Sequence, residues 1–344
     1  MQVGIEDTIV VVGAPALPGL RFRHFRGPAD YAGLAAAGNA SREADGNDWV
    51  ATVEDIAFQH EHLENCDPAT DILIAEGDGT LTGFVRCEWQ REATGLYRYR
   101  IAFGLTPEWR GYGLRRAMLR WAEARLTQVA SGHPDTAPRF YQSSAPRHAA
   151  DLVALLESEG YRPTRYFNRM VRSLAEPIPD TPLPPGLELR PVRPEQYRPI
   201  WDAAHEAFRD HWGYSPWTDE EYEAWLKNPV EFMPQLWQVA WDVDKDEVAG
   251  QIQTFIDAHE NEKFNRRRGY TESISVRRPY RQRGLARAMI MASLRTLQAH
   301  DMTESALHVD TESLSGATRL YEACGYVTDV TYVTYRKPLV APDV

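Results

Sequence analysis

The feature that most constrains the fold of this chain is a long, diverged internal repeat, because a repeated unit must fold in the same way twice. Four landmarks occur in both halves, in the same order and at similar spacing. They are an opening Pro-Gly-Leu segment, an apolar hairpin, an arginine- and glycine-containing turn before a helix, and a helix that ends in Gly-Tyr. They begin at Pro18, Leu73, Trp109 and Leu155 in the first half and at Pro185, Gln238, Tyr280 and Leu320 in the second.

A proline-rich stretch separates the two copies. Five prolines crowd into residues 177–185, and their fixed φ angles and missing amide donors suit a semi-rigid linker. The sequence therefore predicts a domain at 1–175, a linker at 176–184 and a domain at 185–344. A chain of 344 residues is long enough for two domains of ~150–170 residues.

The order of patterns within each copy indicates a mixed α/β domain. Strand and helix patterns open each copy, two or three strands joined by tight turns follow, and strand–helix–strand units complete it. Hairpins pair their strands antiparallel, whereas strand–helix–strand units pair them in parallel. Each copy therefore predicts a partly parallel sheet flanked by helices.

Composition argues against several classes of function. No apolar run approaches the ~18–20 residues that cross a bilayer. The net charge of −11 argues against a nucleic-acid partner, whose phosphates require clustered Lys and Arg. The cysteines Cys66, Cys87 and Cys324 lack metal-ligand spacing. We therefore expect a soluble protein of the reducing cytoplasm, without a metal, a membrane partner or a nucleic-acid partner.

Residues 270–297 carry the strongest pattern for a binding site. Ile274 and Val276 alternate with serines, as in a half-buried strand, and Pro279 ends the pairing because it has no amide donor. Apolar residues then recur every three or four positions, which predicts a helix that begins near Gly284. A strand, a turn and a helix therefore follow one another.

The start of this helix suits an anion. Its first backbone amides lack partners within the helix, and the positive end of the helix dipole points at whatever lies ahead. Gly284 permits close approach of the backbone, and Ala286 keeps side-chain bulk away. Arg281 and Arg283 add positive charge. These features predict a site for a diphosphate.

Two motifs resemble those of a known family. The run 281–286, Arg-Gln-Arg-Gly-Leu-Ala, resembles the Arg/Gln-x-x-Gly-x-Gly/Ala signature of the GCN5-related N-acetyltransferases (GNAT). The segment from Ser313 to Tyr326 resembles the last helix-and-strand motif of that family, although Ser313 or Leu314 stands where the motif usually has an asparagine. Through the repeat, the resemblance covers nearly the whole chain, and the arrangement is similar to that of two-domain acetyltransferases related to mycothiol synthase.

The resemblance implies an enzyme that transfers an acetyl group from acetyl-CoA to a primary amine of a small molecule. The amine attacks the thioester directly, with no metal, and the C-terminal copy binds the coenzyme. The expected coenzyme-binding residues are Ile274, Ser275, Val276, Arg281, Gln282, Arg283, Gly284, Leu285, Ala286 and Ser313.

The resemblance also implies residues for proton transfer. Tyr321 matches the family tyrosine that protonates the departing thiolate, and a packed tyrosine on an apolar helix face is the alternative. Glu272 lies where the family often keeps a carboxylate that takes a proton from the amine, and a surface carboxylate at a strand start is the alternative. The Val276 amide is the expected oxyanion donor.

The acceptor pocket is expected in the first helices of the C-terminal copy, as in the family. The expected acceptor-binding residues are Asp210, His211, Trp212 and Tyr214. Aromatic side chains with a few polar groups suit such a pocket, and a packed aromatic loop is the alternative. His211 is either a general base or a structural histidine.

The N-terminal copy departs from the pattern at two positions. Arg115 stands at the position of Ala286, where its bulk would crowd a pyrophosphate. Leu156 stands at the position of Tyr321, so the proton donor is lost. We therefore predict that this copy is degenerate and performs no acetyl transfer. A non-catalytic acyl-CoA-binding or sensing protein is the alternative function, and two fused copies are compatible with a monomer that contains an internal pseudo-dimer.

Overall fold

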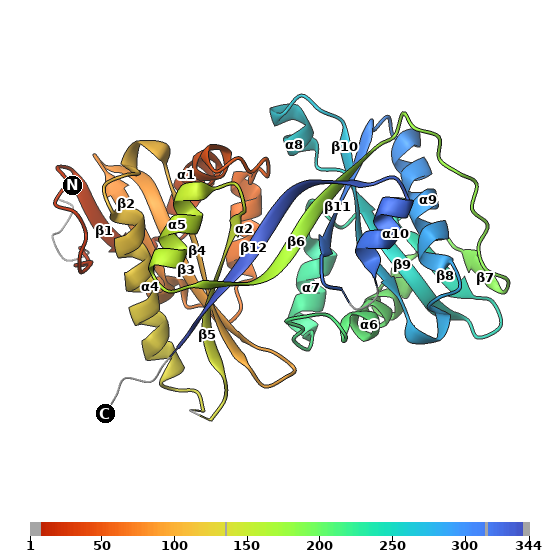
Figure 1. The fold of residues 1–344 in the computed structure, drawn as a ribbon, viewed down its shortest axis with the longest axis horizontal. Coiled ribbons are helices and arrows are strands. Elements are labelled where there is room, and N and C mark those ends of the chain that lie inside the picture. The colour runs from red at the N-terminus through yellow and green to blue at the C-terminus, as the bar shows by residue number, and fades with distance from the viewer. Residues whose placement is uncertain (1–7, 135, 314–315, 340–344) are drawn as a thin grey trace. The chain divides into compact units, whose positions relative to one another are not determined.

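The computed structural model describes residues 8–134, 136–313 and 316–339. Two compact units make up the chain, and each contains a mixed sheet with helices packed on it (Figure 1). This confirms the predicted fold class of two tandem α/β domains.

The two units divide the chain within strands. The first unit ends at Thr164 and takes in the chain again from Val333, and the second comprises Arg165–Tyr332. Each repeat therefore gives residues of its last strand to the sheet of the other unit. For this reason, the units do not coincide with the boundaries around 176–184 that the repeat predicts.

The N-terminal unit builds its sheet from hairpins and one parallel connection. Antiparallel pairing joins β1 to β4 in chain order, and β5 then pairs with β4 in parallel. The strands are β1 (Leu20–His24), β2 (Ile72–Gly77), β3 (Thr80–Arg91), β4 (Tyr97–Leu105), β5 (Arg139–Pro146) and the end of β12 (Val327–Pro338). The helices are α1 (Tyr31–Ala44), α2 (Val53–Glu61), α3 (Pro68–Asp71), α4 (Leu114–Ala130) and α5 (Ala150–Ser158).

The C-terminal unit repeats this arrangement. Antiparallel pairing joins β7 to β10 in chain order, β11 pairs with β10 in parallel, and β6 pairs with β11 antiparallel. The strands are β6 (Arg162–Ser173), β7 (Leu187–Leu189), β8 (Gln238–Asp242), β9 (Glu247–Phe255), β10 (Arg268–Val276) and β11 (Glu304–Asp310). The helices are α6 (Tyr197–Phe208), α7 (Asp219–Lys227), α8 (Ala258–Lys263), α9 (Leu285–Ala299) and α10 (Ala317–Ala323).

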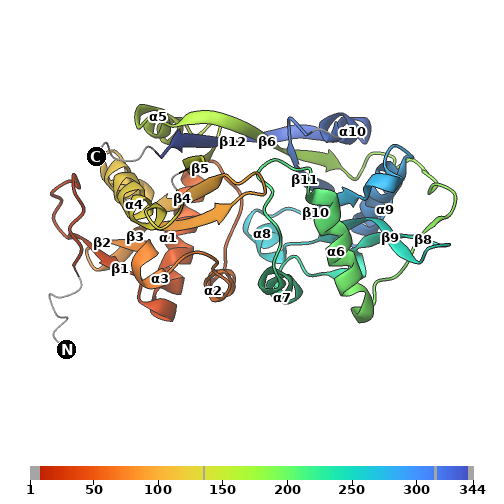
Figure 2. The ribbon, with the colours of Figure 1, turned by 90° about the horizontal axis from the view of Figure 1, so that it is seen from below.

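Helices α6 and α9 cover opposite faces of the C-terminal sheet (Figure 2). Because side chains alternate along a strand, Val239 of β8 packs with Ile200 of α6, whereas its neighbour Ala240 packs with Met289 of α9. Helix α9 begins at Leu285, next to Gly284, as the sequence predicts. The helix buries an apolar stripe at helical spacing, and each large buried side chain contributes about 1.5–3 kcal/mol.

A glycine at the same place in each repeat allows a strand and a helix to pack closely. A Cβ atom at Gly250 would lie 2.8 Å from the Ser275 carbonyl oxygen and 3.1 Å from the Met289 methyl group. At Gly83, a Cβ atom would lie 3.1 Å from a backbone oxygen and 3.5 Å from the Met118 methyl group. In both units, therefore, the strand that carries this glycine, β3 or β9, packs closely against the next strand and the next helix.

Gly250→Ala should destabilise the C-terminal unit, because the added methyl group meets backbone that is held in the sheet. We expect a loss of about 1–3 kcal/mol in the free energy of unfolding, as for other overpacked sites. Thermal unfolding followed by circular dichroism would measure it. The control is Gly132→Ala, where the nearest atom to an added Cβ is 3.5 Å away; equal melting temperatures for the two variants would contradict the prediction.

Candidate active site

The site begins where two parallel strands separate. Strands β10 and β11 are paired over three residues only, from Arg268 opposite Glu304 to Tyr270 opposite Ala306, although both strands continue. The register of β10 with β9 shifts after Glu272, and Ser273 takes a left-handed conformation with φ of 50°. The sequence predicted a regular strand here, and it missed this bulge. Bulges bend a strand and re-aim its side chains, so β10 turns away from β11.

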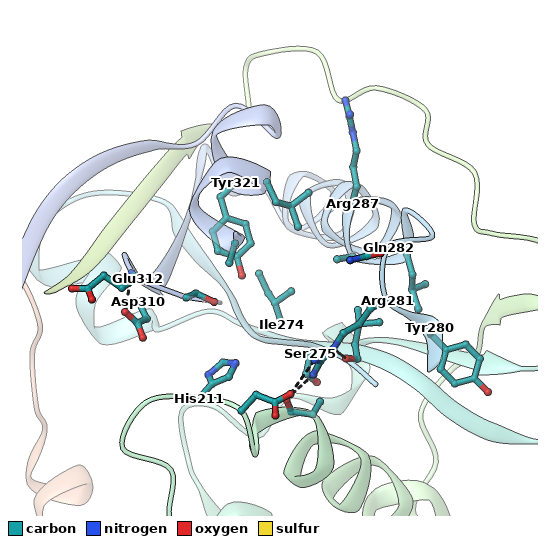
Figure 3. Close-up of a pocket in the computed structure, with 18 of the residues that line it drawn as sticks. His211, Ile274, Ser275, Tyr280, Arg281, Gln282, Arg287, Asp310, Glu312 and Tyr321 are labelled. Atoms are coloured by element: carbon teal, nitrogen blue, oxygen red, sulfur yellow. Dashed lines mark hydrogen bonds and ion pairs between the residues drawn. The ribbon is translucent and has the colours of Figure 1, made fainter. Parts of the chain in front are cut away.

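A pocket of about 910 Å³ lies in the C-terminal unit beside this divergence (Figure 3). Its walls come from the end of β10, the turn and first residues of α9, helix α10, and the segments after α6 and β11. Among the predicted residues, the pocket is lined by Ile274, Ser275, Val276, Arg281, Gln282, Gly284, Leu285, Ala286, Ser313, Asp210, His211, Trp212 and Tyr321. Leu314 lies outside the described residues.

The turn before α9 presents backbone to the pocket. Gln282 and Gly284 both have left-handed conformations, with φ of 61° and 87°. No side chain caps the start of α9, so its first amides are open to a ligand, and the positive end of the helix dipole adds to their attraction for an anion. Arg283 does not line the pocket; its guanidinium donates to the Pro185 carbonyl oxygen at 3.1 Å.

Arg281 ties the end of β10 to the end of α6. Its guanidinium donates to the carbonyl oxygens of Val276 and Ala207 at 2.9 and 3.1 Å and to the Asp210 carboxylate at 3.0 Å. Arg278 forms a second ion pair with the same carboxylate. Hydrogen bonds from the two arginines lower the pKa of Asp210 to about 2. Arg281 and Asp210, which the sequence predicted to contact ligands, therefore already have protein partners. These contacts hold the wall of the pocket.

Tyr321 is buried in α10, with 6% of its surface exposed, and its hydroxyl group points into the pocket (Figure 3). Within the described part of the chain, no hydrogen-bond partner contacts this hydroxyl. Burial first, and then the negative charge of Glu272, raise the pKa of Tyr321 well above that of an ordinary phenol. The group therefore stays protonated at neutral pH and is free to donate to a ligand.

Glu272 does not line the pocket, and it is bonded to a residue that the sequence did not single out. One oxygen of Glu272 accepts two hydrogen bonds of 2.8 Å, from the backbone amide and from Nδ1 of His308. The sequence offered one signal for His308, an exposed position between the apolar Leu307 and Val309 of β11. Nothing in that pattern indicated its partner.

The predicted acceptor residues divide into two groups. His211 and Trp212 line the pocket, and burial lowers the pKa of His211. Tyr214 instead forms a hydrogen bond with His205. The sequence also missed Arg165, which lines the pocket with its guanidinium 5.7 Å from the centre of the Trp212 ring.

Two carboxylates at the end of β11 complete this side of the pocket. Arg165 forms ion pairs of 2.8 Å with both Asp310 and Glu312, and all three residues line the pocket. Two carboxylates against one guanidinium leave this end negatively charged. A cationic ligand group is therefore the better match for it.

The N-terminal unit has the same arginine contacts, but a second arginine side chain lies beside them. Arg110 donates to the Leu105 and Ser41 carbonyl oxygens at 3.2 and 2.9 Å and to Asp45 at 2.8 Å, as Arg281 does to its counterparts. Arg115 then places its guanidinium 3.3 Å from Asp45, with its side chain only 10% exposed.

The Arg115 guanidinium also lies 5.7 Å from the centre of the Phe103 ring. Phe103 stands two residues before Leu105 on β4, as Ile274 stands two residues before Val276 on β10. In the N-terminal unit, the space that Ala286 leaves open in the other unit is therefore filled by a side chain. Leu156, at the position of Tyr321, is fully buried.

A mixed sheet whose parallel strands diverge beside a glycine-led helix defines the class of acyl-coenzyme A acyltransferases, and comparison with known proteins agrees. Residues 199–326 match the model of the acetyltransferase (GNAT) family. The chain is 27% identical over 315 residues to a mycothiol acetyltransferase of Salinispora arenicola, covering 90% of this chain and 94% of that protein. It is 28% identical over 314 residues to a mycothiol acetyltransferase of Thermobispora bispora, covering 90% and 97%.

Solved structures extend the comparison to both units. A GCN5-related N-acetyltransferase from Sphaerobacter thermophilus has a TM-score of 0.72 and 26% identity, over 94% of this chain and 97% of that one. A tandem GNAT protein from the clavulanic acid biosynthesis pathway shares the fold, with a TM-score of 0.68 and 13% identity, over 94% and 100%. The chain is therefore an N-acetyltransferase whose residues 199–326 match the GNAT family, and as a whole it is similar to proteins built from two such domains.

The described residues contain neither a membrane-spanning helix nor a cluster of metal-binding side chains. No helix in this part of the chain is long and apolar enough to cross a membrane. No group of three or more histidine, cysteine or acidic side chains in the same residues has the arrangement of a metal site.

Asp210→Asn should cost stability in a pH-dependent way. The pKa of the Asp210 carboxyl in the folded protein, about 2, lies below its ordinary value of 3.8. Its contribution to stability is therefore complete above about pH 4 and is lost as the pH falls toward about 2. Melting temperatures of the wild type and the variant should differ at pH 5 and converge toward pH 2–3.

The control for this prediction is Asp202→Asn, which removes an exposed ion pair with Arg198 on the surface of α6. Such pairs contribute about 0–1 kcal/mol, so this variant should stay close to the wild type at every pH. A wild-type advantage over Asp210→Asn that does not change between pH 5 and pH 2 would contradict the assignment.

Proposed function

We propose that the C-terminal unit transfers the acetyl group of acetyl-CoA to a primary amine of a small molecule, by direct attack of the amine on the thioester. The observation that carries this proposal is the single pocket that joins the open amides before α9 to the unpartnered hydroxyl of Tyr321. The amides suit the diphosphate of the donor, and the phenol suits its departing sulfur.

The donor is expected to lie along the exposed part of β10. Beyond the bulge, β10 stays paired with β9, but residues 274–276 line the pocket and are not paired with β11. Their backbone groups on this edge can pair with the amide groups of the pantetheine arm as an added strand would. The Val276 amide is then the donor to the oxyanion. Gln282, Gly284 and Ala286 surround the place of the diphosphate.

The acceptor is expected at the aromatic and acidic end of the pocket, near Trp212, Asp310 and Glu312. The two carboxylates favour an ammonium group, and the ring provides an apolar wall. Several relatives are named mycothiol acetyltransferases, so unacetylated mycothiol is the first acceptor to test.

The N-terminal unit is proposed to bind no acetyl-CoA and to perform no transfer, since Arg115 fills its cleft and Leu156 replaces the proton donor. The three cysteines are free, which fits a reducing compartment, and we place the reaction in the cytoplasm. The fused repeat is compatible with a monomer.

Ala286→Arg should fill the C-terminal cleft with a guanidinium group, as Arg115 does in the N-terminal unit. Asp210 lies where Asp45 holds Arg115, so the new guanidinium has a partner and the fold should persist. We expect acetyl-CoA to bind at least about 100-fold more weakly, because the phosphates lose space and charged hydrogen bonds. Isothermal calorimetry measures the affinity.

The matched control is Ala286→Ser, which keeps the side chain small and should bind acetyl-CoA within a few-fold of the wild type. Retained affinity in Ala286→Arg would place the coenzyme elsewhere. Absence of binding by the wild-type chain would overturn the proposed function.

Tyr321→Phe should lower kcat by about 100-fold or more, as expected for loss of a general acid, with little change in the KM for acetyl-CoA. The assay is release of the free thiol of coenzyme A with unacetylated mycothiol as acceptor. The control is Tyr326→Phe, whose buried hydroxyl bonds to the Ser305 hydroxyl at 2.7 Å. That variant should lose about 1 kcal/mol of stability and keep its kcat; equal kcat values for Tyr321→Phe and the wild type would remove the tyrosine from the chemistry.

A further inference from the structure

A histidine and a carboxylate form a fixed pair where β10 and β11 diverge. His308 lies two residues beyond the last paired residue of β11, Ala306. Its backbone amide therefore has no partner on β10, and Glu272 takes the place of the missing carbonyl group. The same oxygen of Glu272 accepts from the backbone amide and from Nδ1 of His308, each at 2.8 Å.

We propose that His308, held in position by Glu272, accepts the proton that the acceptor ammonium must lose before it attacks the thioester. This inference rests on the proposed function and goes beyond it, because it makes His308 the base and gives Glu272 a positioning role. The family resemblance had implied Glu272 itself as the base, with His211 as another candidate.

The hydrogen bonds define which nitrogen of His308 can act. An ionised carboxylate accepts and does not donate, so the proton of the neutral ring lies on Nδ1. The lone pair is then on Nε2, as in other histidines that a carboxylate orients. The His308 side chain is 46% exposed, so a substrate or a water molecule can reach it.

His308 and Glu272 do not line the pocket themselves, but on each strand the residue two positions further on does. Asp310, two residues further along the same face of β11, lines the pocket. Ile274, two residues beyond Glu272 on β10, lines it as well. The charge of Glu272 reaches Tyr321, since it contributes to the raised pKa of that phenol.

Charged and polar groups surround the pair. Glu231, in the segment after α7, is within electrostatic reach of both members: desolvation and the charge of Glu272 raise the pKa of Glu231, and His308 opposes this. Asp257 also acts on Glu231. On the other side, Arg169 of β6 stands opposite His308, but its guanidinium is paired with Asp329 at 2.6 Å. The Tyr332 ring centre lies 6.2 Å from that of His308.

The proton balance of the reaction is complete with these groups. His308 takes one proton from the ammonium and releases it to solvent. The neutral amine forms the C–N bond, the C–S bond breaks, and the thiolate takes the Tyr321 proton. The nitrogen of the product then loses its second proton, which restores the tyrosine. The products are the amide, the free thiol and one proton.

Two variants distinguish a histidine base from a carboxylate base. His308→Asn retains a donor toward Glu272 but has no basic nitrogen, whereas Glu272→Gln retains an oxygen that accepts from His308 but has no charge. The assay uses acetyl-CoA with unacetylated mycothiol, and with glucosamine as a second primary amine, from pH 5.5 to pH 10.

If His308 is the base, His308→Asn lowers kcat/KM for the amine by about 100-fold at pH 7, with acetyl-CoA affinity unchanged. A protonated imidazole cannot accept a further proton, so wild-type activity falls toward acidic pH. This acidic limb disappears in the variant. The difference in kcat/KM between the wild type and His308→Asn closes above the pKa of the amine itself, because the acceptor then binds as the neutral amine.

Glu272→Gln should lose about 10-fold in kcat/KM, since a neutral amide holds the His308 ring in position less firmly than a carboxylate does. A loss in Glu272→Gln that equals or exceeds the loss in His308→Asn, with an unchanged limb in the latter, overturns the proposal in favour of a direct carboxylate base. A normal profile in His308→Asn overturns it as well.

A measurement without substrate separates this proposal from the proposed function. Proton–nitrogen NMR of the histidine rings, with His308→Asn for assignment, should show His308 with its proton on Nδ1, and Glu272→Gln should weaken that preference. If the wild type binds acetyl-CoA but acetylates neither amine, the acceptor assignment fails while the pair is still tested by NMR. If the wild type is active and His308 carries its proton on Nε2, only the pair fails.

Discussion

The site depends on two parallel strands that stop pairing early. Buried backbone donors and acceptors need partners, so strands that separate inside a sheet must replace the bonds they give up. In the C-terminal unit, the Glu272 carboxylate accepts from the His308 amide. In the N-terminal unit, β4 and β5 pair over four residues, from Tyr97 to Arg100 on β4, and the Ser143 hydroxyl then donates to the Ile101 carbonyl oxygen at 3.0 Å. Both units therefore open the sheet at the same place and satisfy the backbone with a side chain.

The two units differ in what occupies the opening. Arg110 and Arg281 make matching contacts that fix the first helix to the end of the fourth strand, so the walls of the two clefts are built alike. The two clefts differ at a single position near the start of the following helix, where one unit has Arg115 and the other has Ala286. Arg115 fills its cleft and shares the carboxylate of Asp45, whereas Ala286 leaves room for a ligand. The proposed loss of coenzyme binding in the N-terminal copy thus requires no change in the scaffold.

The sequence predicted the features that repeat or follow a helical or strand pattern. The hairpins and the start of α9 were placed correctly. The residues expected to bind the coenzyme between Ile274 and Ala286, apart from Arg283, line one pocket. The bulge at Ser273 was missed, because a serine in a left-handed conformation leaves no sign in an alternating pattern. The assignment of strand residues to the opposite unit was missed as well, since an apolar strand reads the same in either sheet.

The partners of site residues were also beyond the sequence. His308 lies 36 residues from Glu272, and Arg165 lies 145 residues from Asp310. No motif spans these distances, and with a single sequence such pairs are visible only after folding. The same limit explains why Asp210 was expected to contact an acceptor, whereas it holds Arg281 and Arg278.

The charge of Glu272 links the two proton transfers. It contributes to the raised pKa of Tyr321, which keeps the phenol protonated at neutral pH. The same carboxylate accepts a hydrogen bond from Nδ1 of His308, which holds the ring of the proposed base in position. One carboxylate at the divergence of two strands therefore acts on the proposed proton donor and orients the proposed proton acceptor, the two groups that an attack by an amine on a thioester requires.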